Sequence, residues 1–195
     1  MISASTAAAS NWDFEFETFG EAKLSEMLGA AKDFIRDMAI ATAPRWLSFL
    51  GRSGTGKTHL ARSITRFFKA EAAICIEPGT GAQLSRRGGS IGWRKVVDHL
   101  RDGDYGIIHA VCNDWFVALD DIGAERASDF SVSKLDQVID ARLDKWTVIT
   151  CNFSQEEIAQ HMDVRIASRL GRGNNVIVDG ICVRDYSTRY QKEVA

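Results

Sequence analysis

The chain has 195 residues, of which 45% are apolar, and a formal net charge of −2. This length suits one hydrophobic core and is short for two, so we expect a disordered lead at 1–12 and a single domain at 13–195. The balanced charge excludes an overall basic field that would attract nucleic acid or anionic lipid, so any such binding must be local. No apolar run approaches the roughly 20 residues of a membrane span, and the start lacks the basic and apolar regions of a secretory signal. We therefore expect a cytoplasmic protein without membrane contact.

The segment before the first strand combines aromatic residues with a helix. Apolar residues at helical spacing from Leu24 to Met38 predict a helix that ends before Pro44. Upstream, aromatic side chains alternate with acidic ones. They either wall an adenine pocket or pack on the domain as a strap, and they are Trp12, Phe14, Phe16 and Phe19.

A glycine-rich segment from Gly51 to Thr58 fits the phosphate-loop pattern G-x-x-x-x-G-K-[ST] at every fixed position. An apolar run of strand length, Trp46–Leu50, precedes it, and apolar positions at helical spacing predict a helix from about Thr58 to Ala70. A chance glycine-rich turn would not require this order of strand, loop and helix. The glycines let backbone N–H groups point at phosphate oxygens, and the positive end of the helix dipole adds to the attraction.

The phosphate loop predicts a Mg-ATP site. Lys57 is expected to reach the terminal phosphates, and the Thr58 hydroxyl is expected to ligate Mg²⁺. The residues that we expect to contact ATP are Gly51, Ser53, Gly54, Thr55, Gly56, Lys57, Thr58 and His59.

The next part of the chain holds its most basic and aromatic stretch. Ala73–Glu77 predicts a second short strand, Pro78–Gly92 a glycine-rich connection, and Trp93–Arg101 a helix. Positive charge together with an aromatic ring is how single-stranded DNA is held without sequence readout. An ordinary solvated surface is the alternative. The candidate DNA contacts are Arg86, Arg87, Arg94 and Lys95, with Trp93 and Arg101 nearby.

A second apolar strand, Trp115–Asp121, ends in two carboxylates, which is the Walker B pattern. A strand buried on both faces has such a continuous apolar run, and its carboxyl end opens beside the phosphate loop. Asp120 is expected to hold Mg²⁺ through water. Asp121 is expected to orient or deprotonate the attacking water, because phosphoryl transfer depends on positioning and charge stabilisation. The alternative is a paired-Asp turn signal.

The remaining elements continue the alternation of strands and helices. A helix over Val132–Leu143 and a strand over Trp146–Thr150 lead to Asn152, whose amide can bind the attacking water or the γ-phosphate. Further helices are predicted by a Ser154/Glu157 capping box and by Asp163. Val176–Val178 is a last core strand, and Ile181–Val183 a hairpin partner. This order predicts a parallel α/β sheet with right-handed crossovers.

The cysteines are expected to be reduced core residues. They lie far apart, with no C-x-x-C pair and no His cluster at metal-ligand spacing. Three lie in apolar runs typical of strands. The four are Cys75, Cys112, Cys151 and Cys182.

Taken together, the motifs resemble those of the AAA+ ATPases of the DnaC/IstB group, bacterial and phage helicase loaders and transposition helper ATPases. The motifs are the phosphate loop with His59-Leu60-Ala61, Leu119–Arg126, Thr150-Cys151-Asn152 and Ser168-Arg169-Leu170. The resemblance implies a P-loop NTPase fold, a three-layer α/β sandwich with a central parallel sheet and little or no C-terminal lid. It also implies that Asn152 is sensor 1, that Arg169 is an arginine finger entering a neighbour's site, and that Arg142 lies in the helix before sensor 1.

Three features of the sequence depart from the family pattern. Asp121 stands where Glu is commonest in AAA+ proteins. The sensor 2 arginine is Arg184, Arg189 or absent, because Tyr186 is not directly followed by arginine. Loaders usually carry an N-terminal helical domain that grips the helicase, and only about fifteen residues precede the ATPase here.

We expect an ATPase that hydrolyses Mg-ATP in a homo-oligomer with shared sites and loads a replicative helicase onto DNA. An IstB-like transposition helper is the close alternative. A nucleotide-gated DNA- or protein-binding module with slow hydrolysis comes from another functional class. A small-molecule kinase lacks support, because nothing in the sequence resembles an acceptor pocket or a mobile lid. Fold by itself does not separate these functions.

Overall fold

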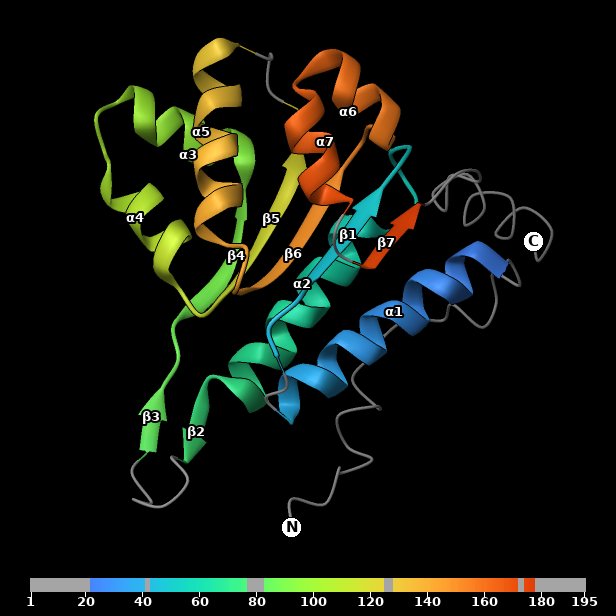
Figure 1. Cartoon of the computed structure of the whole chain (residues 1–195). Coiled ribbons are helices and arrows are strands. Elements are labelled where there is room, and N and C mark those ends of the chain that lie inside the picture. Colours follow the sequence, from blue (N-terminus) through green and yellow to red (C-terminus); the bar gives the residue numbers. More distant parts are fainter. Residues whose placement is uncertain (1–21, 41–42, 77–82, 125–127, 172–173, 178–195) are drawn as a thin grey trace, which may run out of the picture.

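The structure, a computed structural model, describes residues 22–40, 43–76, 83–124, 128–171 and 174–177. Within these residues strands and helices alternate along most of the chain (Figure 1). The strands are β1 Trp46–Leu50, β2 Ile74–Ile76, β3 Gln83–Ser85, β4 Gly88–Gly92, β5 Phe116–Ile122, β6 Trp146–Cys151 and β7 Asn174–Ile177. The helices are α1 Ala22–Ala39, α2 Lys57–Phe67, the π-helical turn η2 Phe68–Ala72, α3 Trp93–Arg101, α4 Gly106–Asn113, α5 Asp129–Ala141, α6 Gln155–His161 and α7 Val164–Leu170.

Five strands form one parallel sheet in the order β4-β5-β6-β1-β7. The strand before the phosphate loop, β1, is central: Ser48 pairs with Ile149 of β6 on one side and with Asn175 of β7 on the other. The chain reaches β7 from β6 through α6 and α7, so this connection passes over β1. The carboxyl ends of β1, β5 and β6 therefore lie at one edge of the sheet, as the sequence predicted.

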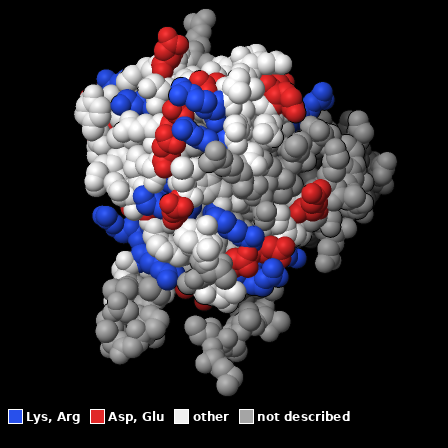
Figure 2. All heavy atoms as spheres, viewed as in Figure 1, with Lys and Arg blue, Asp and Glu red and all other residues white. Residues whose placement is uncertain are grey.

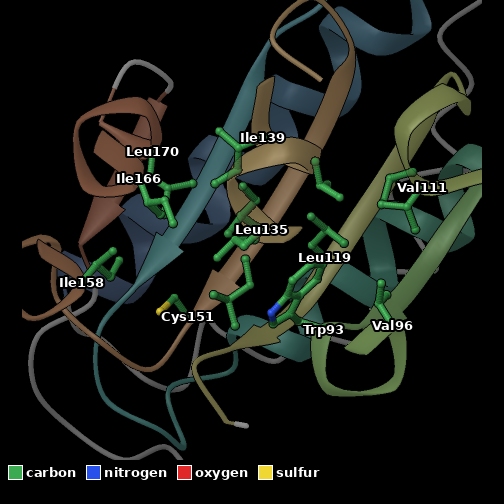
Figure 3. Packing of buried hydrophobic residues seen from close by; sticks show 14 of the residues in the cluster. Trp93, Val96, Val111, Leu119, Leu135, Ile139, Cys151, Ile158, Ile166 and Leu170 are labelled. Atoms are coloured by element: carbon green, nitrogen blue, oxygen red, sulfur yellow. The ribbon is translucent and has the colours of Figure 1, made fainter. Parts of the chain in front are cut away.

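Helices cover both faces of this sheet and create two hydrophobic cores. Along β5, Phe116 and Ala118 belong to the core under α1, α2 and η2, whereas Val117 and Leu119 belong to the core under α3 to α7. Side chains of a strand point alternately to its two faces, so one strand serves both cores. Figure 3 shows the second core, with Trp93 beside Leu119 and Leu135. The predicted three-layer α/β sandwich is confirmed.

Two sequence predictions about the middle of the chain are wrong. The second strand, β2, does not join the main sheet but pairs antiparallel with β3 in a separate two-stranded ribbon. The edge strand β4 lies within the segment predicted as a connection. Its sequence, Gly-Gly-Ser-Ile-Gly, lacks an apolar alternation, so pairing with β5 decides its conformation. A Cβ on Gly88 would lie 2.3 Å from the carbonyl oxygen of Phe116, so this close pairing requires glycine.

Other expectations agree with the structure or concern residues outside it. Cys151 is buried and Cys112 half-buried, while both predicted caps are present at Ser154 and Asp163. Among the described helices, none has the length and apolar character needed to cross a membrane. The remaining expectations lie outside the described residues: the lead at 1–12, the aromatic residues Trp12 to Phe19, the strand at Ile181–Val183, the sensor 2 candidates Arg184 and Arg189, and the C-terminal lid.

Candidate nucleotide-binding site

The phosphate loop joins the carboxyl end of β1 to the first turn of α2. Gly51, Gly54 and Gly56 have φ angles of 124°, 84° and 91°. These angles lie in the left-handed region, which glycine adopts without a steric penalty. Gly56 caps α2 without a side chain, and the first turn carries no acidic residue. Its backbone N–H groups and the helix dipole therefore favour an anion such as phosphate.

Lys57 lies inside the loop with 5% of its surface exposed. Its Nζ donates to the carbonyl oxygens of Gly51, at 2.8 Å, and Arg52, at 2.5 Å, and to Oγ1 of Thr55 at 3.4 Å. Burial lowers the pKa of Lys57, while Cys151 and the two carboxylates at the end of β5 act in the opposite direction. The ammonium is thus held by neutral oxygens in a weakly screened environment, where phosphate would be a stronger partner.

Thr58 connects the phosphate loop to the end of β5. Its Oγ1 donates to Oδ1 of Asp120 at 2.8 Å, across 62 positions of sequence. Since the hydroxyl proton is directed at the carboxylate, the oxygen lone pairs are available to a cation. Hydroxyl and carboxylate oxygens are ligands that suit Mg²⁺, which usually keeps several waters and takes the rest from phosphate. In the described part of the chain, no three His, Cys, Asp or Glu residues gather as a metal site.

Asp121 has a backbone conformation that is uncommon for a residue with a side chain. Its φ is 61°, and it lies where the register between β5 and β6 shifts, after Leu119. Irregularities of this kind are frequent beside active sites because they redirect a side chain. Here the carboxylate meets Asn152, whose Nδ2 donates to Oδ1 of Asp121 at 2.5 Å. The predicted water-binding acid and sensor amide are therefore in direct contact.

Thr150, for which no role was expected from the sequence, lies between these groups. Its Oγ1 donates to Oδ1 of Asp120 at 2.7 Å and accepts the N–H of Asp121 at 2.8 Å. The signal for it was the spacing: Thr150 and Asn152 are two residues apart at the end of a strand, so they share one face of the sheet. Val148, on that same face, packs in the core beneath α2, the helix that begins at Lys57.

Arg169 is not part of this hydrogen-bonded group. Its guanidinium pairs with two carboxylates of α5, through NH1 with Asp136 and through NH2 with Asp140 at 2.9 Å. The side chain is 22% exposed. Figure 2 shows blue and red side chains side by side where Figure 1 places α5 and α7. Two further predicted contacts, Ser53 and His59, are exposed residues of the loop and of α2.

Arg142, expected in the helix before sensor 1, is the C-cap residue of α5 and is completely buried. Its guanidinium donates to the carbonyl oxygens of Val111, Asp114 and Trp146 at 2.7, 3.0 and 2.7 Å. Burial lowers its pKa to about 10, so it stays charged at neutral pH. This arginine joins α4, α5 and β6 and stabilises the fold.

The candidate DNA contacts occupy two separate places. Arg86 and Arg87 precede β4, whereas Arg94 and Lys95 follow it in the first turn of α3. A strand of this length separates them by about 16 Å. Trp93 is completely buried, so it is not available to stack on a base.

An aromatic partner for the first pair is Trp115. The guanidinium of Arg86 lies 4.2 Å from the centre of the Trp115 ring, and Arg87 is 3.7 Å from a carboxylate oxygen of Asp114. An arginine over an indole ring forms a cation–π contact through one face of the guanidinium. The opposite face of the guanidinium is left available for stacking on a base. Trp93, the aromatic residue expected from the sequence, is excluded as a stacking partner by its burial in the core.

Sequence comparisons add no assignment: no protein-family model matches the chain, and no curated protein sequence matches it. Solved structures do match. The DnaC helicase loader aligns with a TM-score of 0.64 and 22% identity, over 82% of this chain and 92% of that chain. DnaI aligns with a TM-score of 0.60 and 17% identity, over 78% of this chain and 81% of that chain. AMPPCP-bound DnaA from Aquifex aeolicus gives 0.62 and 16%, over 82% of this chain and 47% of that chain.

The strand order and the phosphate loop between β1 and α2 define a P-loop α/β fold. The matched structures specify it further: the chain has the fold of the DnaC helicase loader and of DnaI, in agreement with the fold that the sequence motifs predicted. The chain spans most of DnaC and DnaI but only about half of DnaA.

Proposed function

We propose that the protein is an ATPase of replication that binds and hydrolyses Mg-ATP and loads a replicative helicase onto DNA. One observation carries the ATPase part: Thr58, Asp120, Thr150, Asp121 and Asn152 form one hydrogen-bonded chain beside the phosphate loop. The loader part is supported by the likeness to DnaC, DnaI and DnaA. One DnaA structure was solved with the ATP analogue AMPPCP, and another with AMPPCP and single-stranded DNA.

Each residue of the candidate site has a distinct proposed role. Bound Mg²⁺ would supply positive charge at the phosphate oxygens. The N–H groups of the loop and Lys57 bind the phosphates, and Thr58 and Asp120 hold the cation, Asp120 through water. Asp121 accepts a proton from the water whose oxygen attacks the γ-phosphorus, while the bond to ADP breaks. Asn152 keeps the Asp121 carboxylate in place and orients that water.

We propose further that Arg169 completes the site of a neighbouring copy. Charge spread over the transferring phosphoryl group calls for a second fixed cation, and guanidinium stays charged and can bind two oxygens. Within one chain this guanidinium is already paired with Asp136 and Asp140, so it must exchange carboxylates for phosphate oxygens on assembly. Hydrolysis is therefore expected to be slow in the isolated chain and faster in the oligomer.

A nucleotide-gated binding module with slow hydrolysis is the second candidate. The observation that favours it is the contact from Asn152 to the Asp121 carboxylate, because an oxygen that already accepts this hydrogen bond has one lone pair fewer for the attacking water. In this alternative ATP organises the assembly, and hydrolysis only resets it.

The experiment measures ATP turnover and partner binding in parallel. We expect Mg²⁺-dependent hydrolysis without any second substrate, loss of ATP binding in Lys57→Ala, and ATP-dependent retention of a hexameric replicative helicase from the native host. Retention without turnover would support the binding module. Filaments on duplex DNA without helicase binding would support the transposition helper. A protein that binds no ATP would refute all three.

A further inference from the structure

A single buried hydroxyl connects the two carboxylates at the end of β5. Thr150 is 1% exposed, and its Oγ1 makes both contacts at once, donating to Oδ1 of Asp120 and accepting the N–H of Asp121. A threonine hydroxyl has one proton and two lone pairs, so it can serve as donor and acceptor together. No side chain of similar shape without a hydroxyl can replace both contacts.

The bond to Asp120 acts on the metal side of the site. Oδ1 of Asp120 accepts from Thr58 at 2.8 Å and from Thr150 at 2.7 Å. The terminal torsion of an aspartate is soft, with a broad distribution of angles. Two donors from different elements, α2 and β6, restrict this torsion. The carboxylate is thereby oriented before a cation arrives, which lowers the ordering cost of binding.

The hydrogen bond to the N–H of Asp121 fixes the residue that we propose activates the water. The left-handed φ of 61° is unfavourable for most residues and persists only where the surroundings hold it. Thr150 holds the N–H of Asp121 while Asn152 holds its carboxylate, so the residue is fixed at both ends.

We propose that Thr150 is a positioning residue for ATP hydrolysis. Its hydroxyl fixes the orientation of Asp120, which would hold the metal, and the backbone position of Asp121, which would activate the water. This inference rests on the proposed ATPase function. The hydroxyl of Thr150 is occupied by these two contacts, so we infer that it acts through the two carboxylates. Loss of the groups that support metal ligands typically costs about 10- to 100-fold in metal affinity or activity.

The chain offers matched variants for the test. Thr150→Val keeps the shape and removes the hydroxyl, whereas Thr150→Ser keeps the hydroxyl. Thr147→Val is the control, because Thr147 is also a buried hydroxyl of β6 but contacts Arg142 and Lys145 far from the carboxylates. It is expected to lower thermal stability without changing the site.

Two measurements separate positioning from ordinary packing. In the ligand-free protein, hydrogen exchange of the Asp121 amide is compared with that of the Val148 amide in the same sample. Thr150→Val is expected to lose about tenfold protection at Asp121 alone, because one hydrogen bond is removed. With ATP, kcat is expected to fall about 10- to 100-fold and the Mg²⁺ concentration for half-maximal rate to rise, while KM for ATP changes little. Thr150→Ser should restore both.

Contrary results are equally clear. Parent-like exchange at Asp121 in Thr150→Val would refute the inference, and this readout needs neither ATP nor turnover. Equal losses of kcat and amide protection in Thr150→Ser and Thr150→Val would show that Thr150 contributes only packing. The same fall in kcat in Thr147→Val would show this too. Absence of ATP turnover in the parent protein would instead count against the proposed function, because the amide exchange would still report on Thr150.

Discussion

Position 121 provides a test of how the backbone conformation selects the residue that we propose activates the attacking water. Asp121 has a φ of 61° and accepts a hydrogen bond from Asn152 at 2.5 Å. Short polar side chains such as Asp and Asn tolerate the left-handed region, whereas longer ones do not share that tolerance. We therefore expect Asp121→Glu, which introduces the commoner AAA+ residue, to be worse than the parent.

The magnitude follows from two contributions. The left-handed conformation costs an ordinary residue about 1–2 kcal/mol. The lengthened side chain also moves its oxygen from the position that Asn152 reaches, and a lost hydrogen bond costs about 1 kcal/mol. A total of about 2–3 kcal/mol corresponds to a fall in melting temperature of about 4–12 °C for a chain of this size. Asp121→Asn keeps the backbone tolerance and the acceptor oxygen, so its stability should be unchanged.

The assay combines thermal unfolding with single-turnover hydrolysis for the parent and both variants. Asp121→Asn should bind ATP normally and hydrolyse it at least about 100-fold more slowly, since it lacks a basic oxygen. Asp121→Glu should be both less stable and slower than the parent. A Glu variant with parent stability and equal or faster hydrolysis would refute the argument that this backbone conformation selects aspartate.

Three further predictions concern other charged residues. Arg169→Ala and Lys57→Ala should each be almost inactive. Mixing the two variants should restore part of the ATPase rate if Arg169 acts in trans. An ATPase rate per chain that does not depend on protein concentration, with no recovery on mixing, would contradict this. The two basic places are separated by β4, so each should contribute independently to the salt dependence of single-stranded DNA binding. The slope of affinity against salt concentration should fall in the double variant Arg86→Ala/Arg87→Ala and also in Arg94→Ala/Lys95→Ala. Unchanged slopes in both double variants would indicate a solvated surface. Burial lowers the pKa of Lys57 below the 10.5 of an exposed lysine, so the unfolded chain binds more protons between these two values and this residue should make stability rise with pH there. The difference in unfolding free energy between the parent and Lys57→Met should show that rise, and a pH-independent difference would contradict it.

The phosphate loop and the two strand ends were predictable because their signals are local. The pattern Gly51 to Thr58 constrains φ angles and the start of a helix within eight residues, and the structure shows left-handed glycines and α2 where expected. The apolar runs before Asp120 and Asn152 identified buried parallel strands, whose carboxyl ends necessarily share one edge of the sheet.

Only the tertiary structure decided which side chains meet. Thr150 contacts Asp120 across 30 positions of sequence, and Arg169 meets Asp136 across 33. Sequence periodicity gives the face of a strand or helix but not the partner packed against it, so it did not identify Asp120 and Asp136 as the partners. The same reason explains Trp93: its aromatic ring and basic neighbours indicated a nucleic-acid surface, yet the packing of α3 against β5 and α4 places the ring in the core. Gly88–Gly92 forms a strand because it pairs with β5, and the absence of a side chain at Gly88 allows the close approach to Phe116.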